Sequence, residues 1–502
     1  MALAVATPIR RLAWAGPAVP ALVLAVLLGA LLPLLGTTAI ALALGVVLLV
    51  LTARWPALWL LGVVALTSTI FQYAELPRVG SAGTSLYLPE VLLLIVVGAS
   101  LYWVLRARPR LATPPLTAML VAAILIATGL SVLAGAVLYG RPIQEQVSAG
   151  RFMALYALYF PARYLLGKRD TYRWLLIGLL ALAGLTAVVY DLVVLTPLRD
   201  ALVAYPWFAA TIQNLYVSPT LDAIEAGRVY MPGRALIQVL LFPALVLAVT
   251  LSPGSLARRA AIALSVLLVL SVVLIFTRAV WLTTLLAFAL LVALAAGRLR
   301  RALLQITLVG LVAALLVAVA STVFDEPGRL SPVEIVWNRF STIVVDNIND
   351  ENFAFRVREA QMVIDRVDDR WITGSGFGAA LGEQWVYDAS SGQYGFASIF
   401  AYHNGYLSLL LNAGLLALVP FLTLCAVVLF FVCGRRWREP HDPLVLAGGL
   451  GFGVSLVRVL MNGLTESTFS DSFTVPLLVV SLAFLERAVI DWRTRQAELA
   501  SA

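Results

Sequence analysis

The sequence predicts an all-α, polytopic membrane protein, and three observations support this fold class. Hydrophobic residues make up 61% of the 502-residue chain and charged residues 12%, which is about half the charged share of a soluble domain. The mean hydropathy is +0.95, and apolar runs long enough to cross a bilayer recur along the chain. Basic residues cluster in the short loops between these runs, so topology explains the net charge of +8 without a nucleic-acid partner.

Fourteen apolar segments are candidates for membrane-spanning helices, and we expect about 12–14 of them to cross the bilayer. The first is not expected to be a cleaved signal peptide, because many similar segments follow it. The candidates are residues 17–35, 37–53, 55–71, 87–105, 114–139, 151–166, 174–195, 235–252, 259–276, 279–297, 302–323, 407–433, 444–462 and 472–486.

The distribution of arginine and lysine predicts the orientation of these segments. Every basic cluster in a short loop falls on one side when alternate loops are counted, and the positive-inside rule assigns that side to the cytoplasm. Both termini are therefore predicted to be cytoplasmic. The loops 71–86, 140–150, 196–234 and 324–402, together with the Thr277–Arg278 junction, are predicted to face the exterior.

Four regions are expected along the chain, without an appended soluble domain. They are N-terminal transmembrane helices with external loops (1–234), transmembrane helices that carry Arg278 (235–323), a large extracytoplasmic loop (324–402) and C-terminal transmembrane helices (403–502). A loop of this size is too long for a simple connector. Its aromatic residues and its periodicity predict an ordered and partly helical segment.

Within the large loop, residues 352–370 predict an amphipathic helix. The expected apolar stripe consists of Phe353, Val357, Ala360, Ile364 and Val367. At about 100° per residue, Arg358 and Glu359 fall mainly on the opposite, solvated side, whereas Arg356 falls on or beside the buried face. An inward-facing Arg356 is a candidate ligand for an anion, although an ion pair with Glu359 is an alternative.

One of the chain's two histidines, His403, stands where the large loop meets the apolar run 407–433. Imidazole takes up and releases protons near neutral pH. This position lies at the boundary between water and lipid, where a lipid-borne substrate presents its head group. We therefore predict that His403 is catalytic; the alternative is a helix-start residue that bonds loop backbone.

Three separate stretches bring basic groups to the predicted outer face: Arg278, Arg356 and His403. The loops on the same side also carry Arg151, Arg228 and Arg234, which are possible substrate contacts. An alternative for Arg278 is an interfacial anchor that extends to the membrane surface.

Arginines and one histidine suit the transfer of a glycosyl group from a diphosphate. Guanidinium groups bind phosphate oxygens through charge-assisted, bidentate hydrogen bonds. A diphosphate leaving group needs charge stabilisation and the attacking hydroxyl needs a base, but no general acid is required. The sequence therefore predicts no metal site and no cofactor.

Three blocks in the C-terminal half resemble the O-antigen ligase and O-antigen polymerase superfamily. Residues 277–281 (Thr-Arg-Ala-Val-Trp) resemble its "SRGAW" helix start. Residues 356–378 resemble its block of an arginine, a helix and a glycine-rich turn. Residues 403–407 (His-Asn-Gly-Tyr-Leu), followed by Asn-Ala-Gly at 412–414, resemble its "HNxYL" block. The three blocks occur in the family's order and span roughly a quarter of the chain.

The resemblance implies an inverting, metal-independent membrane glycosyltransferase in the inner membrane of a bacterium. It implies that Arg278 and Arg356 bind the diphosphate of an undecaprenyl-diphosphate-linked glycan and that His403 activates an acceptor hydroxyl on the periplasmic or exterior side. The acceptor is another lipid-linked glycan for a polymerase, and a lipid core, as in lipopolysaccharide, or a protein for a ligase. Ala279 stands where the family has glycine, and Trp371–Thr373 where it has a proline-containing turn, but every proposed catalytic side chain is present.

Further side chains near the predicted outer face are possible substrate contacts. Asn404 and Tyr406 belong to the histidine block. Arg458 lies within an apolar segment and Glu466 near its outer end, so the two form either an intramembrane pair or a substrate contact.

Two other functions remain as alternatives. A transporter or flippase of a lipid-linked or anionic solute would also place arginines in a cavity, but many transporters contain two related halves and we find no internal repeat. A non-catalytic scaffold of an envelope-assembly complex is the second alternative.

Overall fold

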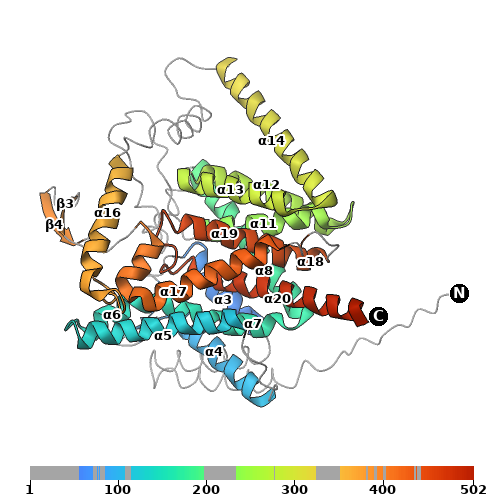
Figure 1. Ribbon diagram of the computed structural model, residues 1–502. Helices are drawn as coiled ribbons and strands as arrows, with labels where there is room; N and C mark the ends of the chain where they lie inside the picture. Colours follow the sequence, from blue (N-terminus) through green and yellow to red (C-terminus); the bar gives the residue numbers. More distant parts are fainter. Residues whose placement is uncertain are drawn as a thin grey trace, which may run out of the picture.

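The computed structural model shows a bundle of helices (Figure 1). It describes residues 56–71, 76, 78–79, 85–107, 115–196, 233–275, 277–323, 351–379, 383–388, 393–398, 403–434, 437 and 442–501. The expected segments 17–35 and 37–53 lie outside the described residues.

The twelve other expected segments all coincide with helical structure. The α-helices are α3 (Pro56–Ser68), α4 (Leu88–Ala107), α5 (Leu116–Val137), α6 (Ile143–Gly150), α7 (Tyr159–Leu166), α8 (Arg169–Leu195), α11 (Arg234–Thr250), α12 (Leu256–Leu274), α13 (Arg278–Leu294), α14 (Gly297–Val323), α16 (Glu351–Val367), α17 (Gly405–Cys433), α18 (Pro443–Leu446), α19 (Phe452–Asn462) and α20 (Val475–Ser501). Two short antiparallel hairpins join β1 (Arg78–Val79) to β2 (Leu86–Tyr87) and β3 (Glu383–Asp388) to β4 (Gln393–Ser398).

The predicted fold class is confirmed: the chain is a mainly α-helical, multi-pass membrane protein. Five described segments are long and apolar enough to cross a membrane, and four shorter apolar helices accompany them. The five are Leu116–Val137, Arg169–Val194, Leu256–Leu274, Gly405–Cys433 and Pro443–Asn462. The full number of spans stays a prediction.

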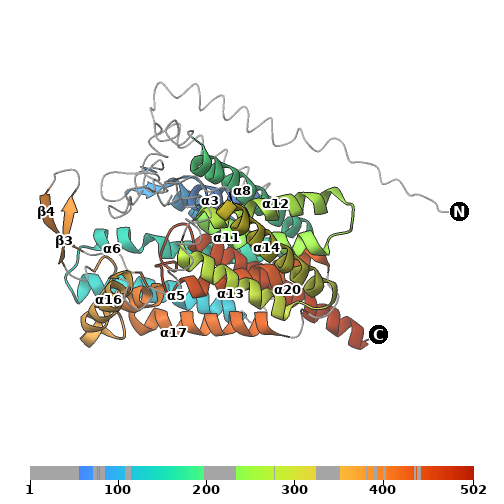
Figure 2. The same ribbon diagram turned by 90° about the horizontal axis from the view of Figure 1, so that it is seen from above.

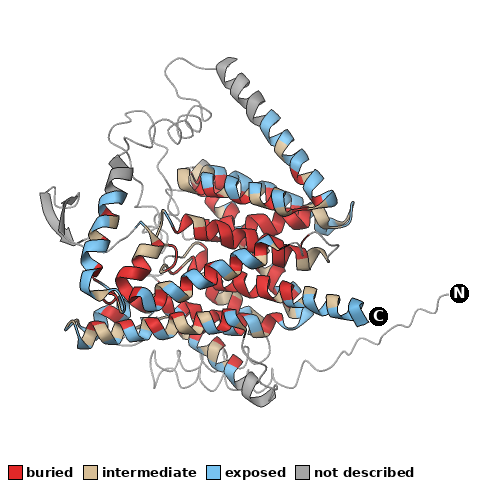
Figure 3. Ribbon diagram, in the orientation of Figure 1, coloured by how far each residue is buried: buried red, intermediate tan, exposed pale blue. Residues whose placement is uncertain are grey.

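Helix α11 lies in the centre of the bundle. Every residue from Arg234 to Ala248 is buried, whereas α5, α12 and α13 each bury only one stripe (Figure 3). The axes of the main helices are roughly aligned in Figures 1 and 2. At one end of the bundle lie α6, α16 and the β3–β4 hairpin, and the C terminus lies at the other (Figures 1 and 2).

The segment 151–166 was expected to form a single helix, but it forms two helical pieces. Residues Arg151–Leu158 form a 3₁₀-helix (η2), and α7 follows directly. A 3₁₀-helix rises about 2.0 Å per residue and an α-helix about 1.5 Å. The two pieces therefore reach about 28 Å, close to the thickness of a bilayer core of roughly 30 Å, although the segment is short.

The glycine-rich turn after α16 docks into a break in α17. Gly414 has φ +64° and ψ −163°, so the long apolar segment is two helices rather than one. The amide of Ser375 donates to Leu411 O at 2.6 Å, and the amides of Leu415 and Leu416 donate to Trp371 O and Ile372 O at 2.7 and 3.2 Å. Loop backbone thus replaces hydrogen bonds that the broken helix lacks, as a segment buried in a membrane protein requires.

We call this docking of the turn after α16 on the break in α17 the joint, and two further contacts complete it. Ser131 on α5 donates its hydroxyl to Asn412 O, a carbonyl that lies beside the break. Gly374 has φ +70°, and a Cβ there would lie 2.7 Å from Ala413 N; a Cβ on Gly414 would lie 2.3 Å from Ile372 O. Only glycine fits at these two positions, because both the backbone angle and the space exclude a side chain.

Prediction for the joint. Gly374→Ala and Gly414→Ala should each lower the free energy of unfolding by about 2–4 kcal/mol, because each combines a positive φ with a backbone clash. Thermal unfolding of the purified protein in detergent measures the effect. The matched control is Gly129→Ala in α5, where a Cβ meets nothing within 4 Å and alanine favours the helix. Substitutions at the joint that are as mild as the control would refute this role.

Candidate functional site

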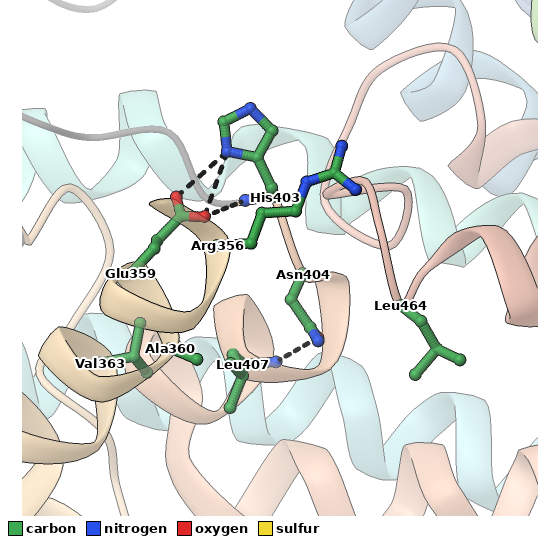
Figure 4. Close-up of a pocket in the computed structure, with 8 residues that line it drawn as sticks. All are labelled: Arg356, Glu359, Ala360, Val363, His403, Asn404, Leu407 and Leu464. Atoms are coloured by element: carbon green, nitrogen blue, oxygen red, sulfur yellow. Dashed lines mark hydrogen bonds and ion pairs between the residues drawn. The ribbon is translucent and has the colours of Figure 1, made fainter. Parts of the chain in front are cut away.

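A pocket of about 310 Å³ lies where α16 meets the start of α17, and we call it the His403 pocket. It is lined by Arg356, Glu359, Ala360, Val363, His403, Asn404, Leu407 and Leu464 (Figure 4). Packing of Val363 and Val367 on Leu410 and Leu411 holds α16 against the first part of α17. The joint at Gly414 holds the other end of that part of α17. The pocket therefore depends on two contacts between α16, its following turn and α17.

His403 pairs with the buried carboxylate of Glu359. The distance from Nδ1 to Glu359 Oε2 is 3.1 Å, and the His403 amide donates to the same oxygen at 3.1 Å. The Glu359 side chain is 6% exposed and that of His403 49%. The carboxylate holds the Nδ1 side of the ring as a donor, so that Nε2 is the nitrogen that can accept a proton.

The predicted surface of α16 is partly wrong. Glu359 was expected on the solvated side but is buried, while Val357 and Ile364 of the expected apolar stripe are 49% and 47% exposed. The buried face instead follows Glu359, Val363 and Val367, because these positions meet α17 and His403. Glu359 contacts His403 and not Arg356, so the alternative pair of Arg356 with Glu359 is not formed.

Arg356 lines the pocket on the Glu359 side of α16, but the residue is exposed rather than buried. Its side chain extends past His403 and ends away from the Glu359 carboxylate (Figure 4). Glu359 follows Arg356 by three positions, so one helix supplies a cation and an acid to the same pocket.

Two predicted substrate contacts have structural roles. Asn404 caps α17: its Oδ1 accepts hydrogen bonds from the amides of Tyr406 and Leu407 at 3.0 and 3.1 Å, although the residue also lines the pocket. The Tyr406 hydroxyl donates to Leu460 O at 2.9 Å, and its ring packs edge-on against Phe469. The block after His403 therefore fixes the helix start on which the histidine stands.

Arg278 is the first residue of α13, as the sequence predicts. The reversal between α12 and α13 is held by Trp281, whose Nε1 donates to Val272 O at 3.0 Å. Helix α13 packs on α19. Arg278 is not among the residues that line the His403 pocket, so its part in the site remains a prediction.

Arg151 belongs to a different cluster. Its Nε lies 3.6 Å from Glu90 Oε1, and its guanidinium lies 4.7 Å from the ring centroid of Tyr87. These contacts tie η2 to the start of α4. Arg151 does not line the His403 pocket, and Arg228 lies outside the described residues.

Of the two alternatives for Arg458 and Glu466, the direct ion pair is not formed, and the substrate contact stays a prediction. Glu466 Oε2 accepts from Arg234 Nη2 at 3.2 Å and from Asn462 Nδ2 at 3.1 Å. Arg458 is 1% exposed, and its Nε donates to Thr284 Oγ1 of α13 at 3.0 Å. The structure thus separates these residues from the His403 pocket and gathers them around a second cavity between α11 and α19.

The fold and the site define a multi-pass membrane protein with a pocket at one end of its helix bundle that contains an arginine, a glutamate and a histidine. Residues 263–422 match the family model described as O-Antigen ligase (Wzy_C). The match includes Arg278, Arg356 and His403, and it confirms the superfamily that the three sequence blocks indicate. The chain thus carries a domain of a glycosyl-transferring family with a polysaccharide-related role. No curated protein matches the chain.

An acidic side chain that the sequence reasoning did not single out lies in the connection between α19 and α20. Asp471 accepts hydrogen bonds from the amide and the hydroxyl of Thr474, at 2.5 and 3.0 Å. Burial raises the pKa of this carboxyl to about 7, and the charge of Glu466 acts in the same direction. The pKa of an unfolded aspartate is about 3.9.

Prediction for Asp471. A carboxyl whose pKa is higher in the folded state stabilises the protein below its unfolded pKa, and this contribution is lost as the pH rises through about 7. The apparent melting temperature should therefore fall from about pH 4 to about pH 7 and level off above, because only in this range does the folded state hold a proton that the unfolded state has lost. Asp471→Asn should flatten this fall, since an amide oxygen still caps the helix but does not ionise. An unchanged pH dependence in Asp471→Asn would contradict the assignment.

Proposed function

We propose that the protein is an inverting, metal-independent glycosyltransferase. It transfers a glycan from an undecaprenyl diphosphate to an acceptor hydroxyl on the extracytoplasmic side of the bacterial inner membrane. The observation that carries this proposal is the His403–Glu359 pair beside Arg356, within the segment that matches O-Antigen ligase. The predicted cytoplasmic location of both termini belongs to the same proposal.

His403 is the proposed base. The acceptor hydroxyl donates to Nε2 and attacks the anomeric carbon, while the bond from that carbon to the diphosphate oxygen breaks. The hydroxyl proton passes to Nε2 as the new glycosidic bond forms. Glu359, on the Nδ1 side, holds the ring and stabilises the imidazolium that results, as the acid of a catalytic triad does.

Arg356 and Arg278 are the proposed partners of the leaving group. Undecaprenyl diphosphate departs with the electron pair of the broken bond, so negative charge grows on its bridging oxygen. Guanidinium groups preorganised at that position stabilise the charge, the role that a divalent cation fills in other transferases. The acceptor remains open between another lipid-linked glycan, as in a polymerase, and a lipid core or protein, as in a ligase.

The break in α17 does not favour a transporter. In transporters, unwound backbone in the membrane coordinates substrate or coupling ions. Here Leu411 O and the amides of Leu415 and Leu416 are already bonded to the loop after α16. The break is thus occupied by the chain itself and serves to position α16 and α17.

Prediction for the base. His403→Ala should lower kcat by about 10²- to 10⁴-fold, the usual contribution of a general base. Glu359→Gln should lower kcat by at least about tenfold while the donor KM changes little, because the ring loses its anionic partner but the phosphate site remains. Transfer from a lipid-linked oligosaccharide to a candidate acceptor, in the presence of a chelator, measures both.

The control for these variants is Arg358→Gln on the exposed side of α16, which should retain wild-type kinetics. Retained transfer in His403→Ala would refute the mechanism. Translocation of the lipid-linked glycan across vesicles without any product would instead support the transporter alternative.

Prediction for the arginines. Arg278→Lys and Arg356→Lys keep the charge but lose the planar fork, so each should raise the donor KM about tenfold and leave the acceptor KM unchanged. Arg366→Lys, an exposed position on the same helix α16 as Arg356, is the matched control. Wild-type donor kinetics in both test variants would exclude these arginines as diphosphate ligands.

A further inference from the structure

A polar cavity lies inside the bundle, next to the His403 pocket but separate from it. Between its side chains it has room for a group of roughly water size. Its polar lining consists of Arg234, Gln238, Arg458, Asn462, Glu466, Thr468 and Thr474. We refer to this space as the polar cavity.

The backbone places the two spaces back to back. The amide of Gly405, two residues after His403, donates to Gly463 O at 2.7 Å. Leu464 lines the His403 pocket, while Asn462 and Glu466 line the polar cavity. The segment 462–466 therefore forms a wall shared by both.

The residue just before α19 packs closely on α11, and this contact sets the depth of the cavity. A Cβ on Gly451 would lie 2.7 Å from Pro243 Cα, so the two backbones approach closely below the cavity. Arg458 donates to Thr284 on α13, six residues after Arg278. At 1.5 Å per residue this contact lies about 9 Å along α13 from Arg278.

Several polar atoms in this cavity are buried and lack a hydrogen-bond partner within the described part of the chain: Gln238 Nε2, Arg458 Nη2, Asn462 Oδ1 and Thr468 Oγ1. Their residues are 4%, 1%, 4% and 3% exposed. Buried polar atoms normally have a partner, and an enclosed polar space without one is the expected mark of a bound molecule or ion.

The hydrogen-bond donors of the cavity favour an anion. Two guanidinium groups, Arg234 and Arg458, share it with the carboxylate of Glu466, and the carboxyl of Asp471 acts on Arg234 from beside it. Gln238 Nε2 and Arg458 Nη2 can only donate, and the Thr468 hydroxyl can donate, so donors outnumber the single acceptor Asn462 Oδ1.

We propose that the polar cavity is an oxyanion subsite that receives one oxygen of a phosphate-class group. Gln238, Arg458 and Thr468 donate to that oxygen, and Arg234 and Glu466 form a paired rim. The natural source is either the diphosphate of a lipid-linked donor or a free inorganic anion. Only the first source rests on the proposed function.

The test separates this cavity from the His403 pocket. The full chain carrying Arg278→Gln and Arg356→Gln, purified in detergent, serves as the background in which the other proposed phosphate ligands are absent. Thermal unfolding is followed while inorganic pyrophosphate, a short-chain prenyl diphosphate or the corresponding neutral prenol is added. A ligand that binds only the folded state raises the melting temperature with concentration.

We expect both diphosphates, but not the prenol, to raise the melting temperature of this background. Adding Thr468→Val or Arg458→Met should raise the half-saturating diphosphate concentration about tenfold, the loss of one charge-assisted hydrogen bond. Arg493→Met, an exposed position near the opposite end of α20, should have no effect. Thr468→Val is nearly isosteric, so it still tests the cavity if Arg458→Met misfolds. The melting temperature without ligand shows whether Arg458→Met is misfolded.

Stronger binding of the prenyl diphosphate supports a lipid-linked source, and equal binding supports a free anion. The proposal is overturned if the background shows no response, or if Thr468→Val and Arg458→Met leave the response unchanged, since the cavity then holds only water. A wild-type protein that binds diphosphate without transferring glycan refutes the proposed function alone. Transfer without a response in the background refutes the subsite alone.

Discussion

The site depends on a backbone joint between the turn after α16 and the break in α17. Four hydrogen-bonding groups freed by the break find partners: Leu411 O, Asn412 O and the amides of Leu415 and Leu416. In a membrane interior no water is present to form hydrogen bonds with such groups. The joint therefore fixes the end of α16 relative to the start of α17, and these two elements carry Glu359 and His403.

Charge in this protein is divided between two neighbouring spaces. The His403 pocket combines a half-exposed imidazole with a buried carboxylate and a nearby guanidinium, which suits proton transfer beside a phosphate. The polar cavity lies behind the segment 462–466 and is lined by two arginines and one glutamate, with the carboxyl of Asp471 close by. Burial deep in the bundle strengthens every electrostatic interaction there, because the surroundings offer little screening. Both spaces lie towards the end of the bundle that carries α16.

Much of the fold and part of the site could be predicted from the residues. Long apolar runs gave the helices, and the three motifs gave the superfamily, because membrane spans and short blocks are local in sequence. Helical phase placed Arg356 beside the buried face, where it lines the pocket but is exposed. The same reasoning missed Glu359 because periodicity reports the polarity of a side chain, whereas the burial of this acid depends on a partner 44 residues away.

The sequence by itself determined the class of protein, the approximate spans within the described residues and the superfamily, and it named Arg278, Arg356 and His403 as candidate site residues. Only the tertiary structure decided which of these side chains meet. It paired His403 with Glu359, gave Arg234 rather than Arg458 to Glu466, and left Arg151 with Glu90. The physical reason is that an ion pair or hydrogen bond forms between atoms within about 3–4 Å, and helix packing sets such distances between residues far apart in the chain.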